Sequence, residues 1–328
     1  MRSNTLEFLL QRFEGILSRE GVEDVAMNGE DNVAWVFQSG KWHRAEIRFD
    51  AHDIEDLATV AAARRGQEIG EHDPLLGVDI TDRLRLQVVL PPCAHRPLMV
   101  LRQGSKSLPT LAGLNQQNYF RKLRPRRDEL SSEDRELADL YRAQHWLPFF
   151  EGCAAYDKTT LICGETGSGK TYFGKARIDA IPYEERLVLM ADTDEHASIR
   201  HPNRVDMFWG KANVRALQLA HAALRMRIGV PVLGEIRDGE AALAFVSIGR
   251  SGHEGGVTTM HARDCKAAKR TLRTRIKETE EGRAHSDADI DEIISETVDV
   301  IVHCYHDRQT DERGLDDVWF KAAEMVPA

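Results

Sequence analysis

The chain has 328 residues, a formal net charge of −9 and a pI near 5.8, with 42% hydrophobic and 30% charged residues. This composition is typical of a globular protein, and the length favours two domains over one. The acidic balance argues against general DNA binding, because neutralising phosphates requires a basic face. Five cysteines without a CxxC pair indicate reduced thiols rather than a disulfide framework or a zinc site.

The N-terminal part predicts an α+β domain. Residues 1–17 carry apolar side chains at helical spacing but are interrupted by charges, so they predict neither a signal peptide nor a transmembrane helix. Such a helix can lie on a lipid surface, but packing on its own domain is the favoured interpretation. Strand patterns follow at 23–29, 32–38, 43–50, 82–92 and 97–103, with a helical pattern at 54–66.

After a linker at 104–109, the pattern changes to alternating strands and helices. Two helical segments are expected around 110–122 and 132–150, with Ser131 or Ser132 as the N-cap of the second. The alternation predicts a mostly parallel sheet covered on both faces, closed by a hairpin in the tail. Strands are expected at 158–164, 186–192, 230–236 and 255–262, and helices after 170, at 213–226 and at 239–250.

The stretch "GETGSGKT", residues 164–171, matches the phosphate-loop pattern G-x-x-x-x-G-K-[ST]. It follows a predicted strand and opens a predicted helix, and this setting disfavours a plain flexible turn. Its glycines allow successive N–H groups to form an anion nest at the positive end of the helix. Lys170 is expected to reach the β- and γ-phosphates of ATP, and Thr171 to hold Mg²⁺. The predicted nucleotide-binding residues are Gly164, Glu165, Thr166, Gly167, Ser168, Gly169, Lys170, Thr171 and Tyr172.

Carboxylates end two other predicted strands. Glu235, in "VPVLGEIRDGEA", follows an apolar strand, where an acid binds a magnesium-bound water or orients the attacking water. Asp192, Asp194 and Glu195, in "LMADTDEHA", suit metal binding or a general base, although a solvated turn is the favoured interpretation for Asp194. The sequence therefore predicts Mg²⁺ ligands among Thr171, Asp192 and Glu235.

The glycine-rich stretch "SGHEGGVTTMHA" carries His253 and His261. A lone histidine is usually a core residue, but two in a segment that follows the phosphate loop favour a phosphate sensor. Neither has neighbours at the spacing of a metal site.

Taken in order, "GETGSGKT", "ADTDE", "LGEIRDGEA" and "SGHEGGVTTMHA" resemble the Walker A, Asp, Walker B and His boxes of bacterial type II and type IV secretion ATPases. The chain is most similar to the traffic ATPase of type IV secretion and conjugation, and the resemblance covers nearly the whole chain. It implies a RecA-like P-loop domain at 110–328, preceded by a smaller, PAS-like α+β domain at 1–103. It also implies a homo-hexamer of two stacked rings, with ATP between the two domains of one subunit.

The resemblance also assigns roles to single residues. Arg85 and Arg102 stand where arginines of the N-terminal domain reach the phosphates, although their alternation on strands also fits plain surface charges. Glu195 matches the acid that activates water, and His261 matches the histidine near the γ-phosphate. The predicted catalytic residues are Lys170, Glu195, Glu235 and His261.

The chain departs from the family pattern at three places. Ala191 replaces a first acid in the Asp box, which shifts the catalytic load to Asp192 and Glu195 and leaves a catalytically weak scaffold as an alternative. Residues 228–229, Ile-Gly, replace Pro-Asp, and Tyr172 replaces a small hydroxyl residue. We expect these last two changes to affect local packing alone.

The function implied is a Mg²⁺-dependent ATPase that powers substrate transfer and pilus assembly from the cytoplasm, peripheral to the bacterial inner membrane. Its partners would be inner-membrane components of the secretion channel and a coupling ATPase, with no direct nucleic-acid binding. The alternatives are a pilus retraction or type II secretion ATPase, a P-loop small-molecule kinase and a nucleic-acid translocase. The type II class often carries a four-cysteine zinc module, the kinase leaves the His box unexplained, and the acidic balance disfavours the translocase.

Overall fold

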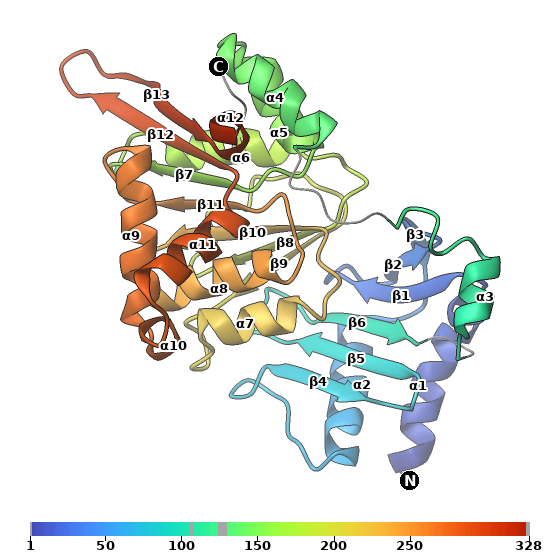
Figure 1. The fold of residues 1–328 in the computed structure, drawn as a ribbon. Coiled ribbons are helices and arrows are strands. Elements are labelled where there is room, and N and C mark those ends of the chain that lie inside the picture. Colours follow the sequence, from blue (N-terminus) through green and yellow to red (C-terminus); the bar gives the residue numbers. More distant parts are fainter. Residues whose placement is uncertain (1, 105–107, 124–129, 326–328) are drawn as a thin grey trace.

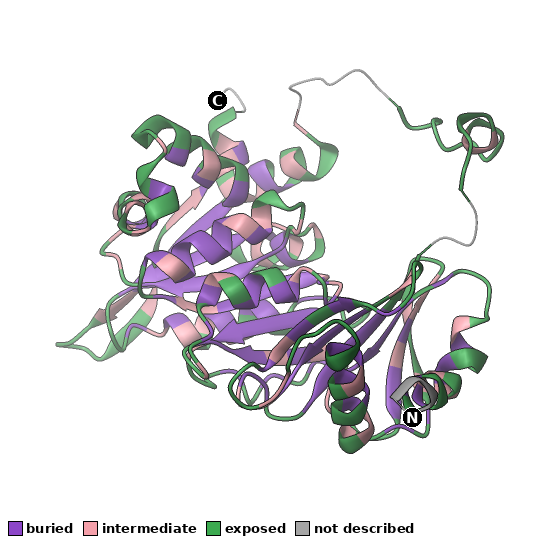
Figure 2. Ribbon diagram, turned by 90° about the horizontal axis from the view of Figure 1, so that it is seen from below, coloured by how far each residue is buried: buried purple, intermediate pink, exposed green. Residues whose placement is uncertain are grey.

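The computed structural model describes residues 2–104, 108–123 and 130–325, which form two sheets packed side by side (Figure 1). Residues 105–107, within the predicted linker, lie outside the described residues. Buried residues form a continuous layer in each half of the molecule (Figure 2). The predicted α/β class is confirmed, with an α+β part ahead of a mostly parallel sheet.

The N-terminal sheet has six antiparallel strands in the order β3-β2-β1-β6-β5-β4. Helix α1 (Arg2–Leu17) buries Leu6, Leu9, Phe13 and Ile16 in the core of this domain, which confirms packing on its own domain. Helix α2 (Ala51–Arg64) begins at a capping box between Asp50 and Asp53. The strands are β1 (Val22–Met27), β2 (Val33–Gln38), β3 (Lys41–Glu46), β4 (Leu75–Asp79), β5 (Leu84–Val89) and β6 (Leu98–Gln103). Strand β4 was not predicted.

The C-terminal sheet has seven strands in the order β13-β12-β7-β11-β10-β8-β9, all parallel except β13. Side chains alternate between two cores: Leu161 and Cys163 face one, and Ile162 faces the other. The strands are β7 (Thr160–Gly164), β8 (Leu187–Ala191), β9 (Arg204–Phe208), β10 (Val230–Ile236), β11 (Val257–Met260), β12 (Val300–Asp307) and β13 (Glu312–Phe320). The predicted closing hairpin is β12–β13.

Helices cover both faces of this sheet, as predicted. One face packs against α7 (Ala216–Ala223), α8 (Gly239–Arg250), α9 (Cys265–Glu278) and α11 (Asp287–Thr297), and the other against α6 (Lys170–Asp179). Helices α9, α10 (Glu280–Arg283) and α11 were not predicted, because their few buried residues are separated by many charges. The remaining helices are α3 (Leu111–Gln116), α4 (Ser132–Arg142), α5 (Trp146–Ala155) and α12 (Lys321–Met325).

The single helical segment expected at 132–150 is two helices. Ser131 caps α4 by accepting a hydrogen bond from the Asp134 amide, as one of the two predicted caps. The chain then turns at Gln144, whose φ of 55° is left-handed, before α5 begins. No helix in the described part of the chain is long and apolar enough to cross a membrane.

The two halves meet along β9, which was also not predicted. Ala94 and Met207 form an antiparallel bridge, and the Phe208 amide donates to the Cys93 carbonyl at 2.8 Å. Arg227 pairs with Asp24 at 2.5 Å, and burial raises the pKa of that carboxyl. A charge-paired contact of this kind gives the halves a defined relative arrangement.

Candidate functional site

The phosphate loop joins β7 to α6 at the carboxyl edge of the parallel sheet, where ligands of open α/β sheets bind. A side chain at Gly164 would collide with the Cys304 carbonyl of the adjacent β12, so this position requires glycine. Gly169 begins α6 in a left-handed conformation, with φ of 94°, and no side chain caps the helix. The first amides of α6 are therefore oriented for an anion.

Lys170 lies inside the loop. Its Nζ donates to the carbonyls of Gly164 at 3.1 Å and Glu165 at 2.9 Å. Burial lowers the pKa of this ammonium, and the nearby Glu235 carboxylate opposes the shift. A cation held against neutral carbonyls gains more from an anionic ligand than one already paired with a carboxylate.

The structure brings His261 and Glu235 to Lys170. His261 follows β11, and its Nδ1 lies 3.4 Å from Lys170 Nζ, while its Nε2 lies 3.1 Å from Glu235 Oε1. A neutral ring with the proton on Nε2 suits both contacts, because Nδ1 then accepts from the ammonium and the polar N–H lies beside the carboxylate. Three of the predicted catalytic residues thus lie in contact, with His261 between Lys170 and Glu235.

Arg237, which the sequence interpretation missed, links the acids. It contacts Glu235 at 2.6 Å, Asp192 at 2.7 Å and Glu195 at 3.6 Å, and the Glu235 hydrogen bond is the main cause of its raised pKa. One guanidinium therefore offsets the mutual repulsion of three carboxylates. The sequence did contain a signal for Arg237. It stands two residues after Glu235, and extended backbone places residues i and i+2 on the same face of a strand.

The residues present fit ATP with Mg²⁺. Ser168 Oγ is buried within the loop without a hydrogen-bond partner in the described structure, as a group that binds a ligand would be. Thr171 Oγ1 lies 3.4 Å from Glu195, at the start of α6, so a hydroxyl and carboxylates of the type that Mg²⁺ prefers lie together. Asp192 and Glu235 pair with Arg237, which also contacts Glu195, although the described residues do not form a cluster of three possible metal ligands.

Three positions singled out in the sequence are not part of the contacts described so far. His253 precedes β11 and so lies at the opposite edge of the sheet, lining a cavity with Lys158 and Asp299, which contradicts its role as a phosphate sensor. Tyr172 is 84% exposed, so its replacement of a small residue is not a packing change. Ala191 is buried at the end of β8.

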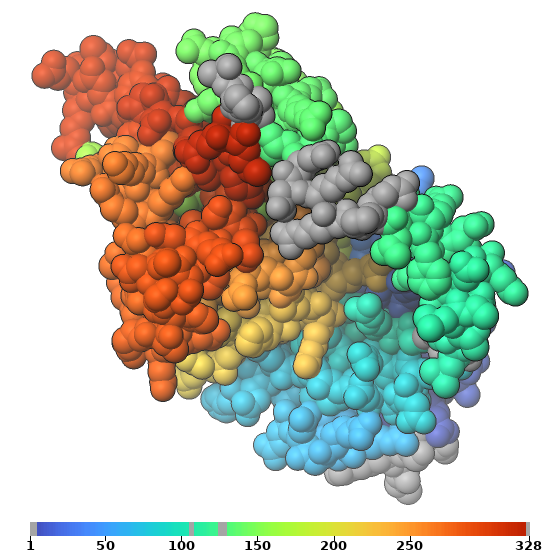
Figure 3. Space-filling view, viewed as in Figure 1, coloured from blue at the N-terminus to red at the C-terminus, as the bar shows by residue number. Residues whose placement is uncertain are grey.

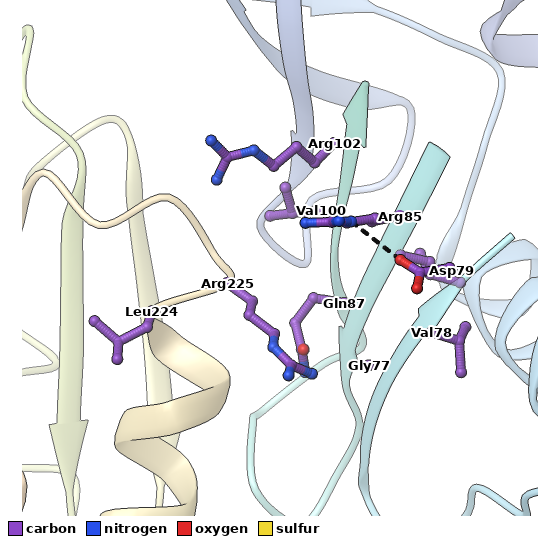
Figure 4. Close-up of a pocket in the computed structure, with 10 residues that line it drawn as sticks. Gly77, Val78, Asp79, Arg85, Gln87, Val100, Arg102, Leu224 and Arg225 are labelled. Carbon is purple, nitrogen blue, oxygen red and sulfur yellow. Dashed lines mark ion pairs between the residues drawn. The ribbon is translucent and has the colours of Figure 1, made fainter. Parts of the chain in front are cut away.

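Arg85 and Arg102 line a different hollow, of about 380 Å³, between the N-terminal sheet and the end of α7 (Figure 4). Arg225 and Gln87 face the same hollow, and Arg85 pairs with Asp79 at 3.1 Å. None of the described residues that line it belongs to the phosphate loop. Within one chain, the structure does not bring these arginines to Lys170.

Two further arginines touch the phosphate loop and were not predicted. Arg313 donates to the Gly167 carbonyl at 3.1 Å, and Arg308 lies 3.3 Å from the Glu165 carboxylate. Both belong to the β12–β13 hairpin, more than 140 residues along the chain, so no local pattern indicated them.

Comparison with known proteins agrees with this site. Residues 100–310 match the family model of the type II/IV secretion system proteins. The chain is 32% identical over 307 residues to the VirB11 protein of Agrobacterium fabrum, covering 90% of this chain and 88% of that protein. It is 29% identical over 331 residues to the type IV secretion system protein VirB11 of Brucella suis, covering 97% and 91%.

The fold agrees as well. The crystal structure of the VirB11 ATPase from the Brucella suis type IV secretion system, in complex with sulphate, matches with a TM-score of 0.91 at 26% identity. The match covers 98% of this chain and 100% of that one, so it includes the N-terminal domain and the RecA-like ATPase domain. The chain therefore belongs to the type II/IV secretion system family, among the VirB11 ATPases of type IV secretion.

Proposed function

We propose that the chain forms a ring of six subunits that hydrolyses ATP with Mg²⁺ to drive substrate transfer and pilus assembly by a type IV secretion system. The observation that carries this proposal is the meeting of Lys170, Glu235 and His261 at the carboxyl edge of the parallel sheet. Three separate sequence boxes supply these residues, so their contact is expected of a nucleotide-hydrolysing site and not of a chance turn.

Each residue has a role in this mechanism. The loop amides and Lys170 would hold the phosphates, and Thr171, Asp192 and Glu235 would hold Mg²⁺, which neutralises charge on the phosphate oxygens. Glu195, beside Thr171, and Glu235 are the two carboxylates that would orient the attacking water and accept its proton.

We assign residues 1–103 to the N-terminal domain, 104–109 to the linker and 110–328 to the RecA-like domain. In support, the last strand of the six-stranded sheet ends at Gln103 and α3 begins at Leu111. Movement of one domain against the other would couple nucleotide binding to work on partners.

We further propose that Arg85 and Arg102 act on the phosphates of a neighbouring subunit. Their separation from the phosphate loop of their own chain supports this, and so does the hollow that they line. Arginines supplied from a second subunit can stabilise charge on a transferring phosphoryl group.

A second surface supports assembly. The segment 108–123 has no buried residue, and it exposes large apolar side chains by between 40% and 97%, namely Leu108, Leu111, Tyr119, Phe120 and Leu123. Several exposed apolar side chains in one short segment are typical of a protein–protein contact, and a second copy of this chain would cover them.

Mixed rings test the arrangement. Arg102→Ala and Lys170→Ala are each expected to be inactive alone. Co-expressed in equal amounts, they should recover about a quarter of the wild-type ATPase rate, because about a quarter of all sites in a symmetric ring then combine an intact loop with an intact arginine from the neighbour. Co-expression of Arg102→Ala with the double variant is the control and should recover nothing. A mixture no more active than its separate components would show that Arg102 does not act between subunits.

The match to VirB11 proteins over at least 90% of the chain favours type IV secretion over the retraction, type II and kinase alternatives. We place the ring in the cytoplasm at the inner face of the inner membrane, in contact with channel components and the coupling ATPase. The net charge of −9 supports a function without direct nucleic-acid binding.

A further inference from the structure

The β12–β13 hairpin extends over the phosphate loop. Strand β12 runs parallel to β7, and Cys304 pairs with Gly164, the last residue of β7. Residues 305–307 continue β12 beyond that point, which carries the hairpin about 10 Å past the end of β7 at about 3.3 Å per residue. The hairpin stands out from the body at the upper left of the space-filling view (Figure 3).

Arg313 reaches from this hairpin to the backbone of the loop. Its Nε donates to the Gly167 carbonyl at 3.1 Å, and its Nη2 lies 2.9 Å from Asp311. Asp311 also pairs with His306 at 2.7 Å, so the acid is fixed from both strands. The guanidinium is therefore oriented by the hairpin itself, with Nε toward the loop.

We propose that Arg313 is a positioning residue for the phosphate loop, holding the peptide between Gly167 and Ser168 in the orientation that binds phosphate. This rests on the ATPase activity of the family. A trans peptide is planar, so a carbonyl held toward Arg313 directs the Ser168 N–H to the other side. There the Glu165 carbonyl accepts from both Ser168 N, at 3.3 Å, and Lys170 Nζ, at 2.9 Å.

The two glycines of this stretch carry no side chain that could hold the peptide by packing. Gly167 and Gly169 both have positive φ, of 81° and 94°, and a side chain built at either would meet nothing within 4 Å. The peptide between Gly167 and Ser168 is therefore held by hydrogen bonds: its carbonyl accepts from Arg313 at 3.1 Å, and its N–H donates to the Glu165 carbonyl at a longer 3.3 Å. Ordering this peptide in advance lowers the entropic cost of binding a triphosphate. The charged Arg313 also polarises the peptide, which makes the Ser168 N–H a stronger hydrogen-bond donor.

Arg313→Met, which keeps the length of the side chain but removes the donor, tests this. We expect the Kd for a fluorescent ATP analogue to rise about fivefold, as for the loss of one partly exposed charge-assisted hydrogen bond, with kcat nearly unchanged. Arg44→Met is the control, because Arg44 is a similarly exposed arginine in the N-terminal domain, at 52% against 48%.

Two readouts separate positioning from general charge and from folding. The rise in Kd should persist at 0.5 M salt, where attraction between exposed charges is screened. Amide hydrogen exchange across residues 164–171 should become faster at an unchanged unfolding temperature. A Kd equal to that of Arg44→Met, or a difference that disappears in high salt, would overturn the proposal. Failure of the wild type to bind the analogue would instead overturn the nucleotide site itself.

Discussion

Replacement of Lys170 by alanine is expected to lower ATP turnover by about a hundredfold or more, since a preorganised cation at the transferring phosphate contributes on this scale. The lysine has no carboxylate partner among the described contacts, only two loop carbonyls and His261, so its charge is available to the phosphates. A coupled assay of phosphate release on purified Lys170→Ala measures the loss.

The same variant should not be less stable than the wild type. Burial lowers the pKa of Lys170, which means that the folded state holds the charged form at a cost relative to the unfolded chain. Removing the ammonium relieves that cost, so the unfolding temperature should stay the same or rise. Lys175→Ala, on the same helix, is the matched control and should retain turnover. A Lys170→Ala protein that keeps more than half of the wild-type rate would contradict the assignment of this loop.

Replacement of Glu235 by glutamine should strongly reduce turnover but keep nucleotide binding. The side chain of Glu235 is only 12% exposed and lies between His261 and Arg237, where its charge orders both partners. The amide keeps the shape but can neither accept a proton nor hold a metal-bound water as strongly, so we expect the rate to fall about a hundredfold. Equilibrium binding of a fluorescent ATP analogue and phosphate release, measured on the same sample, separate the two effects.

The parallel variant Glu195→Gln shows which carboxylate accepts the proton. Glu195 is more exposed and contacts Thr171 at 3.4 Å, whereas Glu235 contacts His261. The carboxylate whose replacement reduces kcat more, at equal nucleotide affinity, is the base. Full activity in both variants would exclude the carboxylates at this edge from catalysis.

The centre of the site was predictable because it depends on local chemistry. A phosphate loop needs glycines, a lysine and a hydroxyl at fixed spacing, and acids after neighbouring parallel strands must meet at one edge. Lys170, Glu235 and His261 were therefore predicted and are found in contact. The prediction that His253 lies at the phosphate site was wrong. His253 is close to His261 in sequence, but the two residues lie at opposite ends of β11.

The other parts of the fold and of the site depend on long-range contacts, which leave no periodic pattern in the sequence. Strand β9 is short and two of its five residues are partly exposed, and α9 carries buried residues such as Leu272 among many charges, so neither gave a clear pattern. Arg313 acts on the loop through a hairpin pairing, which only the sheet order reveals. The separation of Arg85 and Arg102 from the loop likewise follows from how the two halves pack.

The most direct test of the central claim is to measure ATP turnover and molar mass together across protein concentration. A ring ATPase predicts that specific activity rises with concentration in step with a species of about six times the 37.0 kDa subunit mass. It also predicts that turnover and the six-subunit species both require the contacts between subunits, whereas Lys170 is required for turnover alone. Full specific activity in a 37.0 kDa monomer would contradict it.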